Sequence, residues 1–291
     1  IDKTYRSKIE ESVIKIMALD VNNGFNYGYD FGSGFNADVS CVRTQSDGKI
    51  IALGPFITSY NGVPCGKIVR LNTDGSIDNT FTPPTILISS TDLKCEIQST
   101  DKIILYGGGF TLGSSYNIAR LNANGTLDTS FISDSGLTSS TNVNLCISTE
   151  PSTLDNIVVV GNITSYSYFV GGVTPITTIC TGIICLDADG GEYFLFGTPP
   201  TTGNFSGVKQ RPTGDFIVYG DITDFNGYPV YGIVSLNKYG YVLPSAIYPF
   251  ASGNYVEMIA IDNNDNVYIK HTANSYSGGT IGLGNFTSVV A

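Results

Sequence analysis

Charged side chains are scarce in this sequence. Asp, Glu, Lys and Arg make up 14% of its 291 residues, whereas a typical soluble domain has about a quarter. The polar surface must therefore consist mainly of Asn, Ser, Thr, Tyr and Gly, which suits contacts with neutral partners such as glycans or other proteins. The net charge is −10 and no basic stripe is present. We therefore expect no nucleic-acid partner, because phosphate binding needs clustered positive charge.

Long apolar runs are missing as well. No stretch reaches the roughly 18–20 apolar residues that cross a bilayer, and no secretory hydrophobic segment opens the chain. We expect no membrane insertion. The first residue is Ile1 rather than Met, which indicates trimming or processing and leaves a lost signal peptide or pro-segment open.

Residues that carry chemistry are few. His271 is the single histidine, and one imidazole supplies neither a zinc-ligand cluster nor a paired nucleophile. Acidic segments at 20–22, 187–190 and 262–265 resemble fragments of calcium loops without the full spacing and its terminal Glu. They fall at turns, where Asp and Asn serve the backbone. We expect no cofactor, no metal site and no catalytic residue.

Glycine, by contrast, is abundant, and a repeat accompanies it. The 34 glycines follow no collagen-like period, which indicates many tight turns between short strands. Laid against itself, the chain shows copies of one turn segment at Leu71, Leu121, Leu186 and Leu236, spaced by 50, 65 and 50 residues, with a weaker copy at Leu19. A spacing of this size is close to that of a four-stranded propeller blade.

Each copy contains a strongly apolar strand between two turns. Asp-Gly, Asn-Gly and Gly-Asp pairs mark the turns and supply the positive φ that two-residue hairpins require. These pairs are Asp47-Gly48, Asp74-Gly75, Asn124-Gly125, Asp189-Gly190 and Gly214-Asp215. The strands Ile103–Leu105 and Ile157–Val160 are continuously apolar, which indicates cover on both faces.

These features predict an all-β fold, a β-propeller of antiparallel four-stranded blades, because a radial array covers both faces of every blade. A linear β-solenoid is the main rival. Pairing of the N- and C-terminal strands would close a composite blade and give five, and six stays open if 279–291 forms a strand of its own. We predict one domain, 1–291, whose segments are 1–33 (closing strand), 34–81, 82–131, 132–196 (with an insertion at about 165–178), 197–247 and 248–291.

The segments Lys67–Phe81 and Ala119–Phe131 share the pattern Arg-Leu-Asn-x-x-Gly followed by Asp-x-x-Phe. They resemble the delta-60 repeat family of β-propellers, strongly over 34–131, partially over 197–247 and weakly elsewhere. The resemblance implies an interaction module of bacterial surface proteins or phage virion proteins. It implies no catalytic set, so we predict that the chain is not an enzyme.

The cysteines bear on the compartment. Cys41, Cys95 and Cys146 are 54 and 51 residues apart and are predicted to share one buried repeat position, where other copies have Val208 and Ala260. Because bridged cysteines need Cα atoms within about 7 Å, we predict free core thiols, and the same for the pair at 180 and 185. Unpaired thiols fit folding in a reducing cytoplasm before assembly.

The predicted function is a structural or interaction module in a virion (phage tail, fibre or capsid-associated) or at a cell surface. Its partners would be other structural proteins of a larger assembly, or a cell-surface glycan or receptor. The insertion, which includes Tyr166, Tyr168 and Phe169, either binds such a partner or folds back over its own blade.

Two alternatives remain open. A carbohydrate-binding propeller would stack sugars on loop tyrosines, for which the candidates are Tyr60, Tyr116, Tyr228 and Tyr231. A propeller glycosidase would need two facing carboxylates, and the candidates are Asp38, Glu96 and Glu257.

Overall fold

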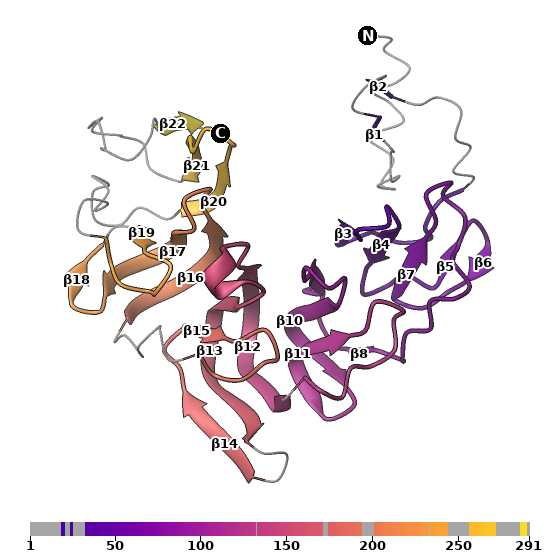
Figure 1. The fold of residues 1–291 in the computed structure, drawn as a ribbon, viewed down its shortest axis with the longest axis horizontal. Helices are drawn as coiled ribbons and strands as arrows, with labels where there is room; N and C mark the ends of the chain where they lie inside the picture. Colours follow the sequence, from indigo (N-terminus) through magenta and orange to yellow (C-terminus); the bar gives the residue numbers. More distant parts are fainter. Residues whose placement is uncertain are drawn as a thin grey trace. The chain divides into compact units, whose positions relative to one another are not determined.

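The computed structural model describes residues 19–20, 24–25, 33–131, 133–170, 174–193, 201–230, 232–243, 256–271 and 286–289. Within them, the regular elements are β-strands and one 3-10 turn, η1 (Pro151–Thr153) (Figure 1). The all-β prediction is therefore confirmed. The described part contains no helix that is long and apolar enough to cross a membrane.

The chain divides into two compact units. The first consists of Ile1–Leu105, Phe110–Leu112 and Arg120–Asp128, and the second of Tyr106–Gly109, Gly113–Ala119 and Thr129–Ala291. The blade boundaries and the single domain inferred from the sequence stay predictions.

An antiparallel meander forms the sheet of the first repeat. β3 (Cys41–Thr44) pairs with β4 (Ile50–Leu53), and β4 pairs with β7 (Ile68–Leu71). An isolated bridge from Leu71 to Ile77 extends the meander by one short step. The same unit contains β1 (Leu19–Asp20), β2 (Gly24–Phe25), β5 (Ser59–Tyr60), β6 (Val63–Pro64), β8 (Leu87–Ile88), β9 (Lys94–Ile97) and the beginning of β10 (Ile103–Leu112).

The second unit repeats this order with longer central strands. β13 (Ile157–Val170) pairs along its length with β12 (Ser133–Ile147), and its two halves pair with β15 (Ile183–Leu186) and β14 (Thr174–Ile179). In the next repeat β17 (Phe216–Phe225) has the same central place. Its partners are β16 (Thr201–Gln210), β18 (Tyr228–Pro229) and β19 (Ile233–Leu236).

Two parallel pairings depart from the predicted antiparallel sheets. β11 (Ser115–Leu121) pairs in parallel with β12 through Tyr116 and Gly136. Gly136 has φ +74°, and a Cβ atom there would lie 2.2 Å from the Tyr116 carbonyl oxygen. Only glycine permits this approach of the two backbones, because a side chain would occupy the same space.

The second parallel pair bears on closure. β21 (Val267–His271) pairs with β20 (Val256–Ile261) on one side and in parallel with β22 (Phe286–Val289) on the other. A closing strand from residues 1–33, as predicted, would have to pair with the edge of β21 that β20 leaves free. In the structure β22 already pairs with that edge. The described residues therefore show no pairing between the two ends, and the number of blades stays a prediction.

The core confirms that the apolar strands are covered on both faces. Residues 157–160 are 0% exposed, as are residues 103–105. Along β17, Phe216 and Val218 belong to one core cluster, whereas Ile217 and Tyr219 belong to another. Alternation between two clusters is what a strand buried between two packed layers requires.

The turns differ from the two-residue hairpins expected from the sequence. In the turn after β7, the Asn72 amide donates to the Ser76 carbonyl and the Gly75 amide donates to the Asn72 carbonyl. This is a three-residue loop with Gly75 at φ +82°. Positive φ at the glycines of all five predicted turns is confirmed, but it serves a type I turn with a glycine bulge.

Candidate functional site

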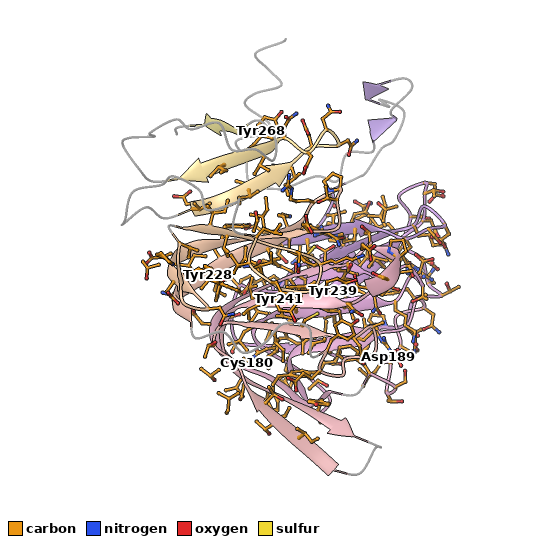
Figure 2. The ribbon with its side chains drawn as sticks, turned by 60° about the vertical axis from the view of Figure 1, so that its left-hand side comes forward. Cys180, Asp189, Tyr228, Tyr239, Tyr241 and Tyr268 are labelled. Carbon is orange, nitrogen blue, oxygen red and sulfur yellow. The ribbon has the colours of Figure 1, made fainter. Side chains whose placement is uncertain are left out.

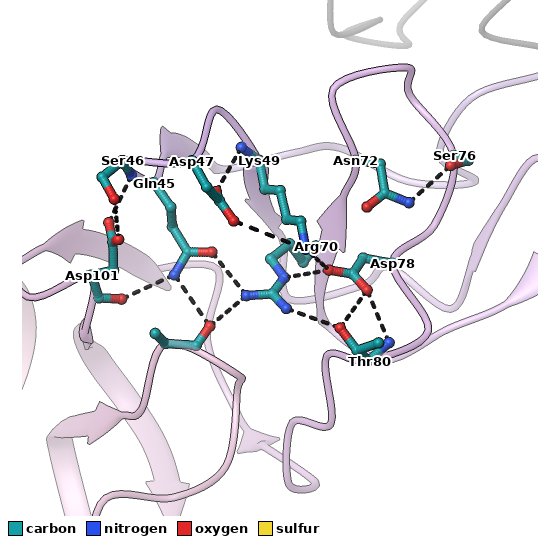
Figure 3. A network of polar contacts seen from close by, with 11 residues as sticks. Gln45, Ser46, Asp47, Lys49, Arg70, Asn72, Ser76, Asp78, Thr80 and Asp101 are labelled. Atoms are coloured by element: carbon teal, nitrogen blue, oxygen red, sulfur yellow. Dashed lines mark hydrogen bonds and ion pairs between the residues drawn. The ribbon is translucent and has the colours of Figure 1, made fainter.

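A buried ion pair joins the last strand of the first repeat to the turn that follows it (Figure 3). Arg70 Nε lies 2.8 Å from Asp78 Oδ2, and Lys49 Nζ lies 2.8 Å from the same oxygen. The Asp78 side chain is 5% exposed. Hydrogen bonds from Lys49 and Thr80 and the charge of Arg70 hold the pKa of this carboxyl well below its usual range.

The same arginine also contacts the next repeat. Arg70 Nη1 donates to Gln45 Oε1 at 3.1 Å and to the Ala123 carbonyl at 2.6 Å. Gln45 Nε2 donates to the carbonyls of Asp101 and Ala123 (Figure 3). The network therefore fixes the turn of one repeat against the neighbouring turn. Its donors and acceptors bond to one another, which indicates a structural role rather than a reactive site.

The second repeat contains the same pair, and the third does not. Arg120 Nε lies 2.7 Å from Asp128 Oδ2, which also accepts from Lys102. In the third copy, hydrogen bonding of the turn places Cys185 and Tyr193 at the arginine and aspartate positions. Sequence reasoning identified the Arg and Asp positions as part of the repeat but missed the ion pair, although their constant spacing was a visible signal.

The insertion forms a hairpin that packs on its own repeat. Tyr166 is 0% exposed and its hydroxyl donates to the Gly190 carbonyl at 2.6 Å. Tyr168 is buried beside Glu192, and burial raises the pKa of its hydroxyl. On the returning strand β14, Ile176 and Ile179 are 40% and 67% exposed. The buried tyrosines fit the interpretation that the insertion folds back over its own blade. The exposed isoleucines of β14 form an apolar surface on the outer side of the hairpin, which fits the binding interpretation. The side chain of Phe169 lies outside the described residues.

The four predicted loop tyrosines have different environments. Tyr60 is 4% exposed and its hydroxyl donates to the Gly75 carbonyl at 3.0 Å, which favours packing over sugar stacking. Tyr116 and Tyr228 are 50% and 44% exposed. Tyr231 lies outside the described residues. Of the three predicted tyrosines that the structure describes, two thus have rings open to solvent.

Among the described residues, three further exposed tyrosines were missed from the sequence: Tyr239, Tyr241 and, at 39%, Tyr268. Tyr239 and Tyr241 are 40% and 65% exposed and lie in the turn after β19 (Figure 2). Lys238 Nζ lies 5.4 Å from the Tyr239 ring centroid and 3.1 Å from Glu150 Oε1 of the preceding repeat. The repeat pattern gave no signal for the two tyrosines of this turn, because its other copies have small or polar residues at these positions.

Tyr228, Tyr239 and Tyr241 lie on turns whose flanking residues pack in one hydrophobic cluster. Phe225 and Val230 flank the hairpin that carries Tyr228, and Leu236 precedes the turn that carries the other two. All three flanking side chains belong to the same buried cluster, against which Val242 also packs. We call Tyr228, Tyr239 and Tyr241 the tyrosine surface. The shared cluster packs the residues that flank these short turns, and a turn that is already ordered lowers the entropy cost of binding.

The candidate glycosidase carboxylates are tied to cations or exposed. Glu96 Oε2 accepts from Arg43 Nε at 2.7 Å, and Glu257 lies 2.6 Å from Lys270 Nζ. Asp38 is exposed. In the described part of the chain, no three His, Cys, Asp or Glu side chains are grouped so that they could hold a metal ion.

The acidic segments serve their turns. Asp187 Oδ1 accepts from the amides of Asp189 and Gly191, and Asp262 Oδ1 accepts from the amides of residues 264 and 266. This confirms the backbone role for the two segments. Val21 and Asn22 of the third segment, and the side chain of His271, lie outside the described residues.

The cysteine positions need a correction. In each repeat, the amide of one residue, which we call the turn donor, donates a hydrogen bond to the carbonyl of the residue just before the central strand. The turn donors of the first two repeats are Gln45 and Gln98. Cys41 lies four residues before Gln45, whereas Cys95 lies three residues before Gln98. The two are therefore not equivalent: the two turn donors are 53 residues apart, whereas the cysteines are 54 apart. Cys95 corresponds to Val208, three residues before the donor of its own repeat.

A protein-family model described as a β-propeller domain of unknown function, DUF5122, matches residues 45–81 and 98–131. These segments contain the turns and ion pairs of the first two repeats. The match supports a β-propeller family for this part of the chain. No curated protein matches the sequence.

Solved structures with a similar fold have low identity to this chain. One is PorZ, an essential bacterial surface component of the type-IX secretion system of Porphyromonas gingivalis, with 10% identity and a TM-score of 0.41, covering 80% of this chain and 31% of that one. A proposed gluconolactonase has 14% identity and a TM-score of 0.40, covering 81% and 70%. Virginiamycin B lyase from Staphylococcus aureus has 12% identity and a TM-score of 0.35, covering 79% and 62%. The chain thus spans about a third of the length of PorZ.

The last two names contradict the prediction that this chain is not an enzyme. A gluconolactonase and a lyase are enzymes, and both are among the chain's structural neighbours. At these identities the neighbours assign no reaction to this chain.

Proposed function

We propose that this chain is a β-propeller-family interaction module that binds a protein partner through the tyrosine surface. The setting would be a virion, such as a phage tail, fibre or capsid-associated component, or a cell-surface assembly. The resemblance of residues 34–131 to propellers of such assemblies supports the setting. The chain would fold in a reducing cytoplasm before it joins the assembly, with its cysteines not joined in disulfides.

The observation that carries the proposal is the exposure of Tyr228, Tyr239 and Tyr241, at 40–65%, over one buried cluster. Large tyrosine rings on a weakly charged surface are typical of protein interfaces, where each ring buries apolar area while its hydroxyl keeps a polar contact. Because only 14% of the residues are charged, recognition would depend on shape and hydrogen bonds more than on long-range electrostatics.

The test uses affinity capture with a matched control. The triple variant Tyr228→Ala/Tyr239→Ala/Tyr241→Ala removes the surface, and Tyr268→Ala removes another tyrosine, 39% exposed, from the same unit. Incubated with dissociated virions or surface extracts of the source organism, the wild type and Tyr268→Ala should retain one partner in a defined ratio. The triple variant should lose it by at least about tenfold, since central interface tyrosines commonly contribute more than about 1 kcal/mol each. Equal retention by all three proteins contradicts the proposal.

The location is tested separately. An antibody against the chain should label intact virions or intact cells without permeabilisation. Labelling only after disruption contradicts the proposed setting and leaves the binding result unaffected.

A carbohydrate-binding module is the second candidate, because Tyr116 and Tyr228 present exposed rings that could stack on the apolar face of a sugar. A glycan array should then show binding that Tyr116→Ala and Tyr228→Ala reduce, while Tyr60→Phe, a change in the core, preserves it. An array without signal contradicts this candidate.

A further inference from the structure

Two cysteines from consecutive repeats lie side by side in the first unit. The Sγ atoms of Cys41 on β3 and Cys95 on β9 are 3.8 Å apart. Cys41 Sγ also donates to the Cys95 carbonyl oxygen at 3.3 Å. Both are free thiols, 8% and 0% exposed. This arrangement differs from the sequence-based expectation, which kept thiols of successive repeats apart.

The contact follows from the shift of one residue between the two positions. Cys41 lies four residues before its turn donor and Cys95 three. Successive side chains of a strand point to opposite faces, so the two cysteines lie on opposite faces of their own sheets. The first sheet packs against the second with the face that carries Cys41, and the second sheet meets it with the opposite face, which carries Cys95. The two thiols therefore meet.

Neighbouring side chains hold β3 and β9 at this separation. Ser40 Oγ donates to the Leu93 carbonyl on one side of the thiols. On the other side, Arg43 Nε donates to Glu96 Oε2 at 2.7 Å. The sulfur atoms need to approach only from 3.8 Å to about 2.05 Å to form a bond. Rotation of the two side chains would bring the sulfur atoms closer while these contacts hold the strands.

We propose that Cys41 and Cys95 are a redox-active thiol pair, a modification site at which a peroxide oxidant produces a disulfide between consecutive repeats. The Cys41 thiolate attacks hydrogen peroxide, the O–O bond breaks, and Cys41 sulfenic acid and hydroxide form. The Cys95 sulfur then attacks the Cys41 sulfur, the S–O bond breaks, and water leaves with the Cys95 proton. Two thiols lose two electrons and the peroxide is reduced to water.

The local charges assign the two roles. The hydrogen bond from Cys95 and the charge of Arg43 lower the pKa of the Cys41 thiol. The bond to Cys41 and burial raise the pKa of the Cys95 thiol. Cys41, which is also the more exposed of the two, is therefore the attacking residue, because the thiolate is the nucleophile.

The test maps the bond in the full chain. The reduced protein is treated with hydrogen peroxide at neutral pH, alkylated in denaturant and digested with trypsin. We expect the peptide Ile16–Arg43 linked to Cys95–Lys102, with the mass of two hydrogen atoms lost and four of the six cysteines alkylated. The thermal unfolding midpoint should rise by about 5–10 °C, because the bond restricts the unfolded chain, and dithiothreitol should reverse the rise.

Two variants each replace one cysteine of the pair by valine. Cys95→Val introduces the residue at the corresponding position of the fourth repeat, Val208. This variant and Cys41→Val should lose the linked peptide and the shift of the midpoint, whereas Cys65→Ser should keep both. Six alkylated cysteines after oxidation of the folded wild type, or linkage of a different pair, would overturn the proposal even if a valine variant does not fold.

Discussion

At the scale of single residues, the polar interior of the first unit includes an arginine side chain, Arg70, that serves two repeats. Arg70 is paired with Asp78 in its own repeat and donates to the Ala123 carbonyl in the next one. A planar guanidinium suits this task, because its donors point in several fixed directions. A lysine at the same position could neutralise Asp78 but could not satisfy the other acceptors.

Loss of the Asp78 charge should be costly. In Asp78→Asn the guanidinium of Arg70, whose side chain is 8% exposed, stays buried beside a neutral group. We expect the free energy of unfolding to fall by about 3 kcal/mol, as for other broken buried pairs, when urea unfolding is followed by circular dichroism. Asp74→Asn is the matched control, since Asp74 is exposed in the preceding turn and Asn keeps its acceptor for Ser76. A similar loss in both variants would contradict a special role for the ion pair.

The same pair predicts a pH dependence. Its hydrogen bonds and ion pairs depress the pKa of Asp78 in the folded protein. The stabilisation is therefore fully present above the pKa of an unfolded aspartate, about 3.9, and is lost as the pH falls toward the folded value. Between about pH 4 and pH 2 the wild type should lose stability faster than Asp78→Asn. Parallel pH profiles of the two proteins would show that Asp78 titrates normally.

At the scale of elements, the turn of one repeat receives an aromatic ring from the repeat before it. A Cβ atom on Gly125, at φ +92°, would lie 2.8 Å from Phe81 Cε2. Gly190 stands in the same relation to Phe131 in the second unit. The Asp-x-x-Phe motif thus places a ring against the next turn, and the turn glycine is needed both for its backbone conformation and for this contact.

A pair of glycine substitutions separates these two needs. Gly62 has φ +78° and a Cβ atom there would meet no atom within 4 Å. Gly62→Ala should therefore cost about 1 kcal/mol of unfolding free energy from backbone strain alone. Gly125→Ala should cost about 3 kcal/mol, because overpacking against Phe81 is added. The double variant Phe81→Ala/Gly125→Ala should then show a loss smaller than the sum of the single losses, and strict additivity would contradict the contact.

At the scale of the whole molecule, the question of closure concerns the edges of β21. β20 covers one edge and β22 covers the other. A propeller closed by its N-terminal strand would need that second edge, because a strand pairs with only one neighbour on each side. The predicted closure by residues 1–33 thus requires an edge of β21 that residues 286–289 cover in the structure.

Hydrogen exchange on two truncated chains distinguishes the two pairings of this edge. Removal of residues 286–291 should expose the amides of 267–270 and raise their exchange rates by at least about tenfold. Removal of residues 1–33 should leave these rates unchanged. The reverse pattern would show that the N-terminal strand closes the last blade in solution.

The sequence alone determined the features that depend on local chemistry. Repeat length, strand positions and turn positions follow from the apolar runs and from glycines that need positive φ, and residues 103–105 and 157–160 are buried on both faces as their composition predicted. These signals are local, because burial on both faces and turn conformation are each imposed on a short segment by its own residues.

Tertiary packing decided what depends on the contacts between segments. Cys41 and Cys95 meet because their positions in the two repeats differ by one residue. Tyr60 is buried whereas Tyr228 is exposed, although both lie at the hairpin that follows a central strand. β22 joins β21 in parallel. The physical reason is that a shift of one residue reverses the face of a strand, so register and neighbours, rather than residue type, decide which side chains meet.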